Sequence, residues 1–374
     1  MDNKLNIGFD AKRAFLNDAG LGHFSRNTIL SLSDFYPKNN YFLFTPDVDI
    51  ERFQAPERAT IIYPQAWWSI LKSLWRTYKI AGLAEAAGLD IYHGLSHELP
   101  RGIEQTGIKC VVTMHDLIFM RFPEFYNMTD RKIYLRKVQH ACQAADKIIA
   151  ISQQTKNDLI QFIGADPAKI KVIYQAIKPI YFTKSSKQEL LETQKKLALP
   201  PHFMLTVGTL EARKNLASIL KALNKLNTRT PLVVIGKKTN YLNHLKPLVQ
   251  KLGDQLIFLQ EVNDTDLSRL YQLAELMIYP SVFEGFGLPI AEAQACGCPV
   301  ITSNISSMPE AGGDGAHYIH PKKYKEISEA IQQISKDKAY RDVLIFKGQL
   351  NAERFTGKAY AQQLMTLYKE LDHA

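Results

Sequence analysis

The sequence is poor in cysteine and has no long apolar run, and both features restrict the class of protein. Only four cysteines occur in 374 residues, at Cys110, Cys142, Cys296 and Cys298. They are few and scattered along the chain. The close pair Cys296 and Cys298 lacks the nearby histidines of a zinc site, so small buried side chains are the favoured interpretation. No segment reaches the roughly 18 apolar residues that span a bilayer, and the start, MDNKLNIGFD, lacks the apolar core of a signal peptide. We expect a cytoplasmic protein.

Low-complexity tracts and short-period repeats are also missing, and the composition is that of a packed globular protein. Hydrophobic residues make up 46% of the chain and charged residues 22%, and the length favours two domains over one. The formal net charge is +9, from 46 basic and 37 acidic residues. This charge suits an anionic partner but does not choose between a nucleotide, a nucleic acid and a lipid headgroup.

Apolar strand-like runs alternate with segments of helical periodicity along the whole chain. The first half contains LNIGF (5–9), YFLF (41–44), TIIY (60–63), DIYHG (90–94), CVVTM (110–114), KIIAI (147–151) and KVIY (171–174). The second half contains FMLTV (203–207), PLVVI (231–235), LIFL (256–259), LMIY (276–279) and PVIT (299–302). This alternation predicts an α/β protein with two parallel sheets covered by helices.

The break between the two strand series falls in YQAIKPIYF (174–182), where Pro179 interrupts regular structure. We therefore predict two domains, over residues 1–178 and 183–355. The last segment, about 356–374, carries apolar side chains at helical spacing, namely Leu364, Leu367, Tyr368 and Leu371. We expect this helix to pack back on the first domain.

Ligands of open parallel sheets bind beyond the carboxyl ends of the strands, and three loops stand at such positions. The first is PSVFEGFGLPIAEAQACG (280–297), in which Pro289 is expected in the first turn of a helix that Gly297 ends. Backbone amides and a helix N-terminus favour an anion, whereas Glu284 and Glu292 accept hydrogen bonds from vicinal hydroxyls. The loop thus predicts a ligand with phosphate and hydroxyls, such as a nucleotide sugar. If Glu292 merely complements the helix dipole, Glu284 and the glycines stay unexplained.

The second loop is VGTLEARKNL (207–216), which follows the strand FMLTV. Asn215 is the expected N-cap of the next helix, so Arg213 and Lys214 stand just before a helix N-terminus, where fixed charge and dipole add. This arrangement predicts a diphosphate site, with a solvated basic surface pair as the alternative.

The third loop is DAGLGHFSRN (18–27), where Gly20 and Gly22 permit close approach of the backbone to a ligand. A helix is expected from His23 onward. The third glycine of a dinucleotide fingerprint is missing, and no acidic residue clearly ends the next strand, which argues against NAD.

With these motifs the sequence resembles the family 4 retaining glycosyltransferases, which use nucleotide-sugar donors. The segments GLGHFSRN, VVTMHDLIFMRFPEFY (111–126), ADKIIAISQQTKNDLI (145–160) and KIKVIYQAI (169–177) follow the family pattern in the same order, so the match covers nearly the whole chain. The spacing of Glu284 and Glu292 is the family's most specific signature. The resemblance implies the GT-B fold, with two Rossmann-like, doubly wound domains that face a cleft.

The resemblance also implies roles for individual residues. Glu292 would hold the donor ribose, Glu284 with the amides of 286–288 would hold the transferred sugar, and Arg213 and Lys214 would bind the diphosphate. The loop of Gly20 and Gly22 would close over the donor, and His115 would reach the sugar. The implied catalytic residues are His115, Glu284, Arg213 and Lys214. The implied donor-binding residues are Gly20, Gly22, Gly208, Thr209, Arg213, Lys214, Val262, Glu284, Gly285, Phe286, Gly287, Leu288 and Glu292.

The sequence departs from the family at Thr209, where many members carry arginine, so charge neutralisation falls on Arg213 and Lys214. Because these cations can stabilise a leaving diphosphate, we expect no metal and no other cofactor, and no DxD-like carboxylate pair is placed to bind one. His115 is predicted to hydrogen-bond the donor sugar or orient the attacking hydroxyl, with a structural histidine as the alternative. Asp116 is expected to order its own loop. The resemblance implies retention of anomeric configuration without a protein nucleophile.

The segment YPQAWWSILKSLWRTYKIAGLAEAAG (63–88) is predicted to be a basic aromatic helix. Contact with an anionic membrane and a lipid-linked acceptor is one interpretation. Burial in the core, with cations that extend to the solvent, is the favoured one. An exposed tryptophan as a platform for an acceptor sugar is a third.

The resemblance implies transfer of a hexose from a nucleotide sugar to a glycan or glycolipid in surface polysaccharide assembly. By the same resemblance GDP-mannose is the first donor expected and a UDP-sugar the second. A sugar-nucleotide epimerase of the same fold and a non-catalytic nucleotide-sugar-binding scaffold are the alternatives. A nucleic-acid binder is disfavoured because the 46 basic residues are spread along the chain.

Overall fold

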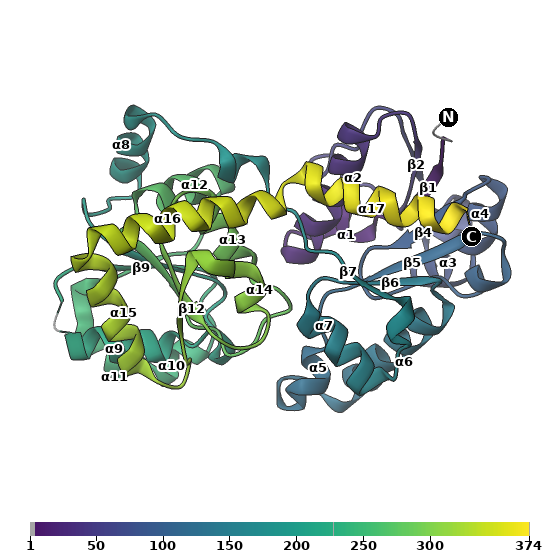
Figure 1. Ribbon diagram of the computed structural model, residues 1–374. Coiled ribbons are helices and arrows are strands. Elements are labelled where there is room, and N and C mark those ends of the chain that lie inside the picture. Colours follow the sequence, from purple (N-terminus) through teal and green to yellow (C-terminus); the bar gives the residue numbers. More distant parts are fainter. Residues whose placement is uncertain (1–3, 227, 374) are drawn as a thin grey trace. The chain divides into compact units, whose positions relative to one another are not determined.

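The computed structural model describes residues 4–226 and 228–373, which form two units, each built around one parallel sheet (Figure 1). The first unit comprises Met1–Ala176 and Gly357–Ala374, and the second comprises Ile177–Thr356. The chain thus leaves the first unit once and returns to it for its last helix.

The sheet of the first unit has seven strands in the order β3-β2-β1-β4-β5-β6-β7, and all neighbours are parallel. The strands are β1 (Asn6–Asp10), β2 (Asn40–Phe44), β3 (Ala59–Ile62), β4 (Ile91–Gly94), β5 (Lys109–Met114), β6 (Lys147–Ala150) and β7 (Ile170–Val172). Every strand predicted for this half is confirmed. The central strands are buried on both faces, as expected where helices cover a parallel sheet.

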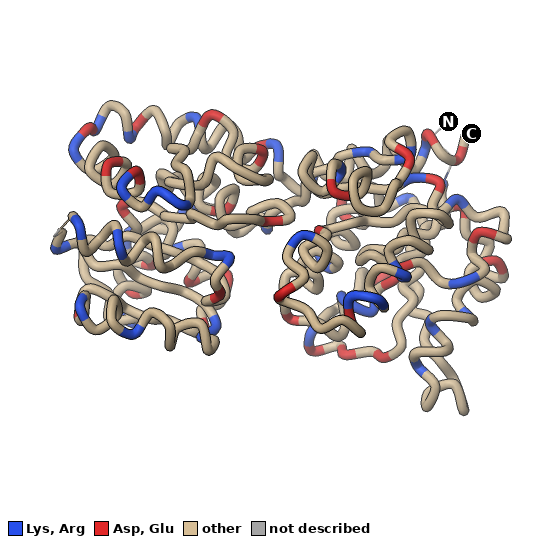
Figure 2. The backbone as a smooth tube through the Cα atoms, turned by 90° about the horizontal axis from the view of Figure 1, so that it is seen from below, with Lys and Arg blue, Asp and Glu red and all other residues tan. Residues whose placement is uncertain are grey.

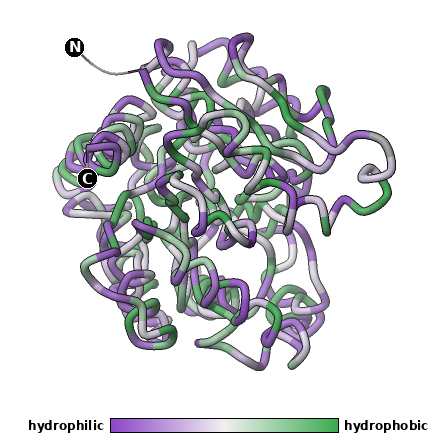
Figure 3. Tube along the Cα trace, turned by 90° about the vertical axis from the view of Figure 1, so that its right-hand side faces the viewer, coloured by the Kyte–Doolittle hydropathy of each residue, from purple (hydrophilic) through white to green (hydrophobic). Residues whose placement is uncertain are grey.

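The α-helices of the first unit are α1 (Lys12–Leu16), α2 (Gly20–Phe35), α3 (Lys72–Tyr78), α4 (Ile80–Ala86), α5 (Ile118–Arg121), α6 (Met128–Ala144), α7 (Gln153–Asp158) and α17 (Gly357–Asp372). The last helix packs on α2. Its buried face includes Leu364, Leu367, Tyr368 and Leu371, and the Tyr368 hydroxyl lies 2.6 Å from His93 Nδ1 in the core. Hydrophilic and hydrophobic residues alternate along the helical ribbons, as amphipathic helices with one buried side require (Figure 3).

The sheet of the second unit has six parallel strands in the order β10-β9-β8-β11-β12-β13, the order of a doubly wound Rossmann-like sheet. The strands are β8 (Met204–Val207), β9 (Leu232–Ile235), β10 (Leu256–Leu259), β11 (Leu276–Tyr279), β12 (Val300–Ser303) and β13 (Ala316–Ile319). The first five are confirmed predictions. The sixth, an edge strand with the sequence AHYI, was not among the predicted strands.

The second unit has α-helices on both faces of its sheet (Figure 1). The helices are α8 (Lys187–Lys196), α9 (Leu216–Leu226), α10 (Tyr241–His244), α11 (Lys246–Leu252), α12 (Asp264–Leu273), α13 (Leu288–Ala295), α14 (Met308–Gly312), α15 (Tyr324–Lys336) and α16 (Lys338–Ala352). Among them α9 packs with α11 and α15, whereas α13 packs with α12 and α16.

The single helix predicted for residues 63–88 is wrong, because the segment divides into a 3₁₀ turn, Ala66–Ser69, and the helices α3 and α4. Trp75 and Ile80 are both in the core, and a spacing of five residues would place them on opposite sides of one straight helix. The break at Lys79 lets both side chains reach the interior. Trp67 and Ile70, by contrast, are 58% and 83% exposed. None of the described helices is long and apolar enough to cross a membrane.

Candidate functional site

Two of the predicted loops meet in the second unit because β8 and β11 are hydrogen-bonded neighbours, so their carboxyl ends open at the same edge of the sheet. The loop after β11 is tied to the loop after β8 by two hydrogen bonds. The Val282 amide donates to the Arg213 carbonyl at 2.9 Å, and the Ser281 hydroxyl donates to the same oxygen at 3.0 Å. This arrangement fixes the backbone that carries the predicted cations.

Arg213, Lys214 and Glu284 form one cluster at this edge. Arg213 NH1 lies 2.6 Å from Glu284 Oε2, and Lys214 Nζ lies 2.7 Å from Glu284 Oε1. The Lys214 ammonium also donates to the Tyr279 hydroxyl at 2.6 Å, and Ser281 donates to Glu284 Oε1 at 2.5 Å. Two loops that are 65 or more positions apart in the sequence are thereby held as one polar group.

Glu284 and Arg213 both keep their charge over the physiological pH range. Burial alone would raise the pKa of Glu284, but Lys214 and Arg213 lower it to about 2. Burial would lower the pKa of Arg213, yet Glu284 and Glu211 raise it above its ordinary value. The carboxylate is therefore ionised, and it holds two cations at a position where their remaining N–H groups can bind an anion.

Several residues that support the cluster were not predicted from the sequence. Tyr279 and Ser281 contact Lys214 and Glu284 directly. The Ser307 hydroxyl donates to the carbonyls of Glu284 and Phe286, at 2.9 and 2.7 Å, and so holds the glycine-containing loop. Tyr279 was recognisable as the last residue of a strand that ends at the site. Ser307, however, follows a different strand, and no local pattern connects it with this loop.

Glycine conformations shape the loops that surround the cluster. Gly208 has φ +136°. The Lys214 side chain lies where a side chain at position 208 would point, since a Cβ there would be 3.3 Å from Lys214 Cε. Gly236, which was not predicted, has φ +147°, and a Cβ there would meet the Gly208 carbonyl oxygen at 2.1 Å. Thr209 is exposed in the same loop, and Val262 lies half-buried after β10. The glycines thus allow two strand ends to approach closely.

The predicted N-cap role of Asn215 is wrong. Asn215 has left-handed φ of +60°, and its side-chain amide donates to the carbonyls of Pro280 and Pro321, at 3.0 and 2.8 Å. The side chain therefore joins three loops and does not accept from the first amides of α9. Asparagine tolerates this backbone conformation better than most residues.

The loop 284–288 leads into α13, which begins at Leu288 as expected, after Gly287 with φ +112°. Gly285 separates Glu284 from Phe286, whose ring is buried and packs edge-to-face on Phe355, with centroids 5.3 Å apart. Glu292, one helical turn inside α13, accepts a hydrogen bond from the Tyr271 hydroxyl at 3.2 Å. Burial raises the pKa of Glu292 to about 7, while Tyr271 acts in the opposite direction. The environments of the two glutamates thus shift their pKa values in opposite directions: neighbouring cations lower that of Glu284, and burial raises that of Glu292.

The glycines of the first unit lie in a helix rather than in a loop, because α2 begins at Gly20, three residues before the predicted start. The Asn17 side chain accepts hydrogen bonds from the amides of Ala19 and Gly22, at 2.9 and 3.3 Å, and so stabilises the first turn. A Cβ at Gly22 would lie 1.8 Å from the Asn17 carbonyl oxygen, whereas nothing lies within 4 Å of one at Gly20. Gly22 is thus needed for the local fold.

His115 lies at the end of β5 in the first unit, with both ring nitrogens engaged. Nε2 is 2.9 Å from the Leu95 carbonyl oxygen, and Nδ1 is 3.1 Å from the Gln175 amide nitrogen. Burial lowers the pKa of His115 to about 3, so the ring is neutral. Asp116 accepts from the Ile118 amide at 3.0 Å and orders the start of α5.

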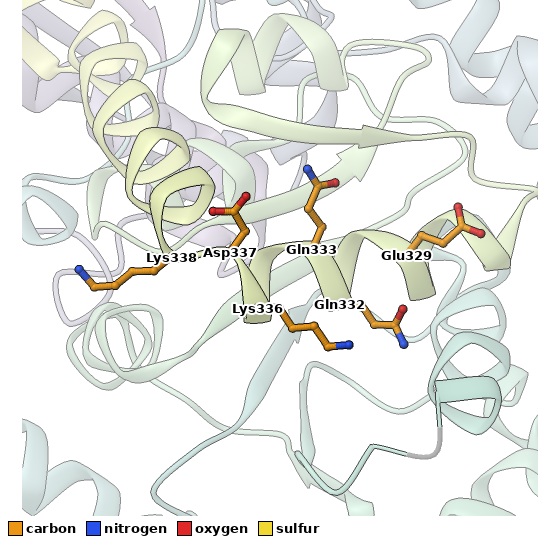
Figure 4. A pocket seen from close by; sticks show the side chains of 6 residues that line it. All are labelled: Glu329, Gln332, Gln333, Lys336, Asp337 and Lys338. Carbon is orange, nitrogen blue, oxygen red and sulfur yellow. The ribbon is translucent and has the colours of Figure 1, made fainter.

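Other surface features lie apart from these loops. An open hollow of about 530 Å³ lies at the end of α15 and the start of α16, lined by Glu329, Gln332, Gln333, Lys336, Asp337 and Lys338 (Figure 4). Basic and acidic residues are interspersed along both units (Figure 2). Within the described part of the chain, no group of three or more His, Cys, Asp and Glu side chains is arranged to hold a metal ion.

Comparison with known proteins agrees with this fold and shows the family. The family models described as "Glycosyl transferases group 1" and "Glycosyltransferase Family 4" match residues 187–350 and 27–179. The O-antigen chain mannosyltransferase B of Escherichia coli is 32% identical over 288 residues, which cover 75% of this chain and 74% of that protein. The O-antigen chain mannosyltransferase RfbU of Salmonella typhimurium is 26% identical over 305 residues, covering 81% and 79%.

Among solved structures, HepE of Anabaena in complex with UDP matches with a TM-score of 0.76 at 18% identity, covering 98% of this chain and 100% of that one. The two Rossmann-like units define an enzyme of the GT-B class. The chain belongs to glycosyltransferase family 4.

Proposed function

We propose that this glycosyltransferase moves a mannosyl group from GDP-mannose to a glycan or glycolipid acceptor in the assembly of a surface polysaccharide. The observation that carries the proposal is the cluster of Arg213, Lys214 and Glu284 beside the glycine loop of α13, which suits a sugar diphosphate. The choice of mannose and of a polysaccharide acceptor rests on the relatives named as O-antigen chain mannosyltransferases. A UDP-sugar is the second donor, since HepE was solved with UDP.

In this proposal the cations act on the leaving group. The bond between the anomeric carbon and the β-phosphate oxygen breaks, and negative charge develops on the nucleoside diphosphate next to Arg213 and Lys214. The acceptor hydroxyl oxygen forms its bond to the anomeric carbon on the same face, and its proton passes to the departing phosphate oxygen. The configuration is thereby retained without a protein nucleophile, and the fixed cations do the work of a metal ion.

The remaining donor-site residues bind and orient. Glu292 accepts hydrogen bonds from the ribose hydroxyls, Glu284 and the amides of Phe286 to Leu288 hold the transferred sugar, and Val262 lies beside the base. His115 acts through the orientation of its loop.

A donor panel tests this function. The protein is incubated with GDP-mannose, UDP-glucose, UDP-galactose and UDP-N-acetylglucosamine, and both thermal stabilisation and slow hydrolysis of the sugar diphosphate bond are measured, with and without a chelator. We expect the largest stabilisation and release of mannose with GDP-mannose, unchanged by the chelator. Conversion of a nucleotide sugar to its epimer, or a strict requirement for Mg²⁺, would overturn the proposal.

We also propose that the enzyme works at the cytoplasmic face of an anionic membrane. The side chains of Trp67 and Ile70 expose apolar area, and Lys72, which pairs with Asp47, and Lys79 follow them in the sequence. Apolar area together with positive charge is the combination that binds peripheral segments to anionic lipid.

A further inference from the structure

The loop that carries Glu284 lies between two other loops of the second unit. In the sheet of this unit β11 is the neighbour of β8 on one side and of β12 on the other. The loop 280–287, which follows β11, therefore has the loop of Arg213 and Lys214 on one side and the loop 304–307, which follows β12, on the other. Two serines of the loop 304–307 hold its backbone.

Ser307 uses its hydroxyl in an uncommon way for its position. It is the residue before α14, where a serine side chain commonly accepts a hydrogen bond from an amide of the first helical turn. Within the described part of α14 no amide makes this bond. The hydroxyl instead lies 2.9 Å from the Glu284 carbonyl oxygen and 2.7 Å from the Phe286 carbonyl oxygen. The side chain is fully buried, so the contact with the neighbouring loop replaces the capping contact.

Ser306 supplies a second hydroxyl, from an uncommon backbone conformation. Its φ is +58°, a value that few residues other than glycine adopt. The hydroxyl oxygen lies 3.1 Å from the Glu284 carbonyl oxygen and 3.3 Å from the Glu284 amide nitrogen. One side chain thus donates to and accepts from the backbone of the same residue. A strained backbone persists only where surrounding contacts fix it, and here the contact is with Glu284.

The planar trans peptide unit gives these contacts a consequence for N–H groups. The C=O of one residue and the N–H of the next point in opposite directions. The Ser303 hydroxyl donates to the Ser281 carbonyl at 2.6 Å. The N–H of that peptide unit, which belongs to Val282, donates to the Arg213 carbonyl at 2.9 Å. In this unit the carbonyl faces the β12 side and the N–H faces the β8 side.

The same geometry applies to the peptide unit between Phe286 and Gly287. Its carbonyl is held by Ser307, so the Gly287 N–H points away from Ser307 and toward the side of the loop after β8. Gly287 stands directly before the first turn of α13, whose amides favour an anionic or oxygen-rich ligand. A donor whose diphosphate contacts the cations of the β8 loop would lie on this side.

We propose that Ser307, together with Ser306, is a positioning residue that orients the Gly287 N–H toward the sugar of the bound donor without touching the donor itself. This inference rests on the proposed function, because the N–H needs a donor to bind. The serines act through the backbone alone. Their loss should therefore affect the sugar and the bond that breaks, but not the contacts of Arg213 and Lys214 with the nucleoside diphosphate.

The test compares Ser307→Ala with the matched control Thr302→Val in the full chain. Thr302 is also fully buried, and its hydroxyl donates to the Tyr279 carbonyl at 2.8 Å. The next residue is Pro280, so that peptide unit has no N–H to orient. Calorimetry measures GDP affinity, and slow hydrolysis of GDP-mannose measures turnover. We expect Ser307→Ala to hydrolyse GDP-mannose about tenfold or more slowly than the wild type, with GDP affinity unchanged. Thr302→Val should lose melting temperature but not hydrolysis.

Ser306→Gly keeps the test decisive if Ser307→Ala fails to fold. Glycine adopts a φ of +58° without strain, so this variant should melt near the wild-type temperature while its hydrolysis falls. Wild-type hydrolysis in both serine variants would overturn the proposal, and so would an equal loss of hydrolysis in Thr302→Val.

Hydrogen exchange separates this inference from the proposed function, because it needs no donor. Mass spectrometry measures exchange of the backbone amides of residues 284–290 in the free protein. We expect faster exchange in Ser307→Ala than in Thr302→Val, since the carbonyls that fix these peptide units are released. If the wild type hydrolyses UDP-glucose and not GDP-mannose, the donor assignment fails, and the variants are compared with UDP-glucose. If it hydrolyses neither, equal exchange in the two variants rejects the positioning role and faster exchange in Ser307→Ala supports it.

Discussion

At the scale of single residues, Glu284 connects the two cations of the site, since its carboxylate pairs with both Arg213 and Lys214. The substitution Glu284→Gln keeps the shape of the side chain and removes its charge. We expect stability to fall by about 1 to 3 kcal/mol, less than for a fully isolated buried pair, because Arg213 keeps Glu211 as a partner. Turnover should fall about 10- to 100-fold, with GDP affinity equal to or above that of the wild type, because the cations lose a competing anion.

Calorimetry with GDP and a thermal melt measure these effects. Glu211→Gln is the matched control, because it removes the other carboxylate on Arg213 from a more exposed position. Its turnover should stay within about threefold of the wild type. A loss of GDP affinity in Glu284→Gln as large as its loss of turnover would contradict the assigned role.

The raised pKa of Glu292 leads us to expect that donor binding depends on pH. Its pKa of about 7 in the folded protein lies above the ordinary value of 4.5, so the folded state holds the proton more tightly than the unfolded state. The contribution of Glu292 to stability is thus complete below pH 4.5 and declines as pH rises to about 7. Ribose hydroxyls donate to the ionised form. We therefore expect GDP affinity to fall as pH decreases from 8 to 6, with a proton released on binding.

Calorimetry in two buffers of different ionisation enthalpy counts that proton. Glu292→Gln should bind GDP more weakly, by about 1 to 3 kcal/mol, and the pH dependence should disappear. A wild-type affinity that is constant between pH 6 and 8 would exclude Glu292 as the ribose ligand.

At the scale of elements, the two glycines at the start of α2 allow a requirement of the fold, at Gly22, to be tested separately from a requirement of donor binding, at Gly20. A Cβ at Gly22 meets the Asn17 carbonyl oxygen at 1.8 Å, and one at Gly20 meets nothing within 4 Å. We expect Gly22→Ala to reduce stability by about 1 to 3 kcal/mol. Gly20→Ala should leave stability unchanged or slightly higher, while raising the KM for the donor if the donor approaches this turn. Melting curves and donor kinetics of both variants decide, and an unchanged KM in Gly20→Ala would remove it from the donor site.

The elements differ in how far the sequence alone predicts them. Strands such as LVVI and LMIY were predictable because four consecutive apolar residues between turn signals mark a buried parallel strand. The strand β13 was not, since AHYI places His317 and Tyr318 half-exposed at a sheet edge. The start of α2 was misplaced because its stabilising contact comes from Asn17, which precedes the glycines. The loop motifs indicated Arg213, Lys214 and Glu284 as candidate site residues. Ser307 and Gly236 could not be found in this way, because their roles come from contacts with loops that are distant in the sequence.

The exposed turn before α3 gives the membrane proposal a direct test. Replacing Trp67 and Ile70 together by Ser removes two exposed apolar side chains, at 58% and 83% exposure, and leaves the buried Trp75 in place. We expect binding to vesicles of phosphatidylglycerol and phosphatidylcholine to weaken at least about tenfold, with the melting temperature unchanged. Phe346→Ser with Leu350→Ser, at two exposed positions of α16, is the control. Co-sedimentation equal to the wild type would reject this contact.

At the scale of the whole molecule, the proposed donor groups are confined to one unit. Arg213, Lys214, Glu284 and Glu292 all lie within Ile177–Thr356, and so does every strand of their sheet. The two ends of this segment are held together, because the Ile177 amide donates to the Phe355 carbonyl at 2.9 Å. Tyr181 is anchored near the start of the segment by a hydrogen bond to Asp264 at 3.2 Å. The segment therefore has its own core, and its first and last residues lie next to each other, as in a domain that can fold independently.

We predict that residues 177–356, expressed alone, fold cooperatively and bind GDP within about threefold of the full-chain affinity. The same fragment should transfer no sugar, because it lacks the whole first unit, Met1–Ala176 and Gly357–Ala374. Calorimetry with GDP, a urea melt and an assay with GDP-mannose measure the three properties. The fragment with Lys214→Ala is the control, since it removes one cation but none of the residues that close the segment, and it should bind GDP at least about tenfold more weakly. If the fragment melts cooperatively and still fails to bind GDP, the nucleotide site requires groups from the first unit, and the assignment of the donor to the second unit is wrong.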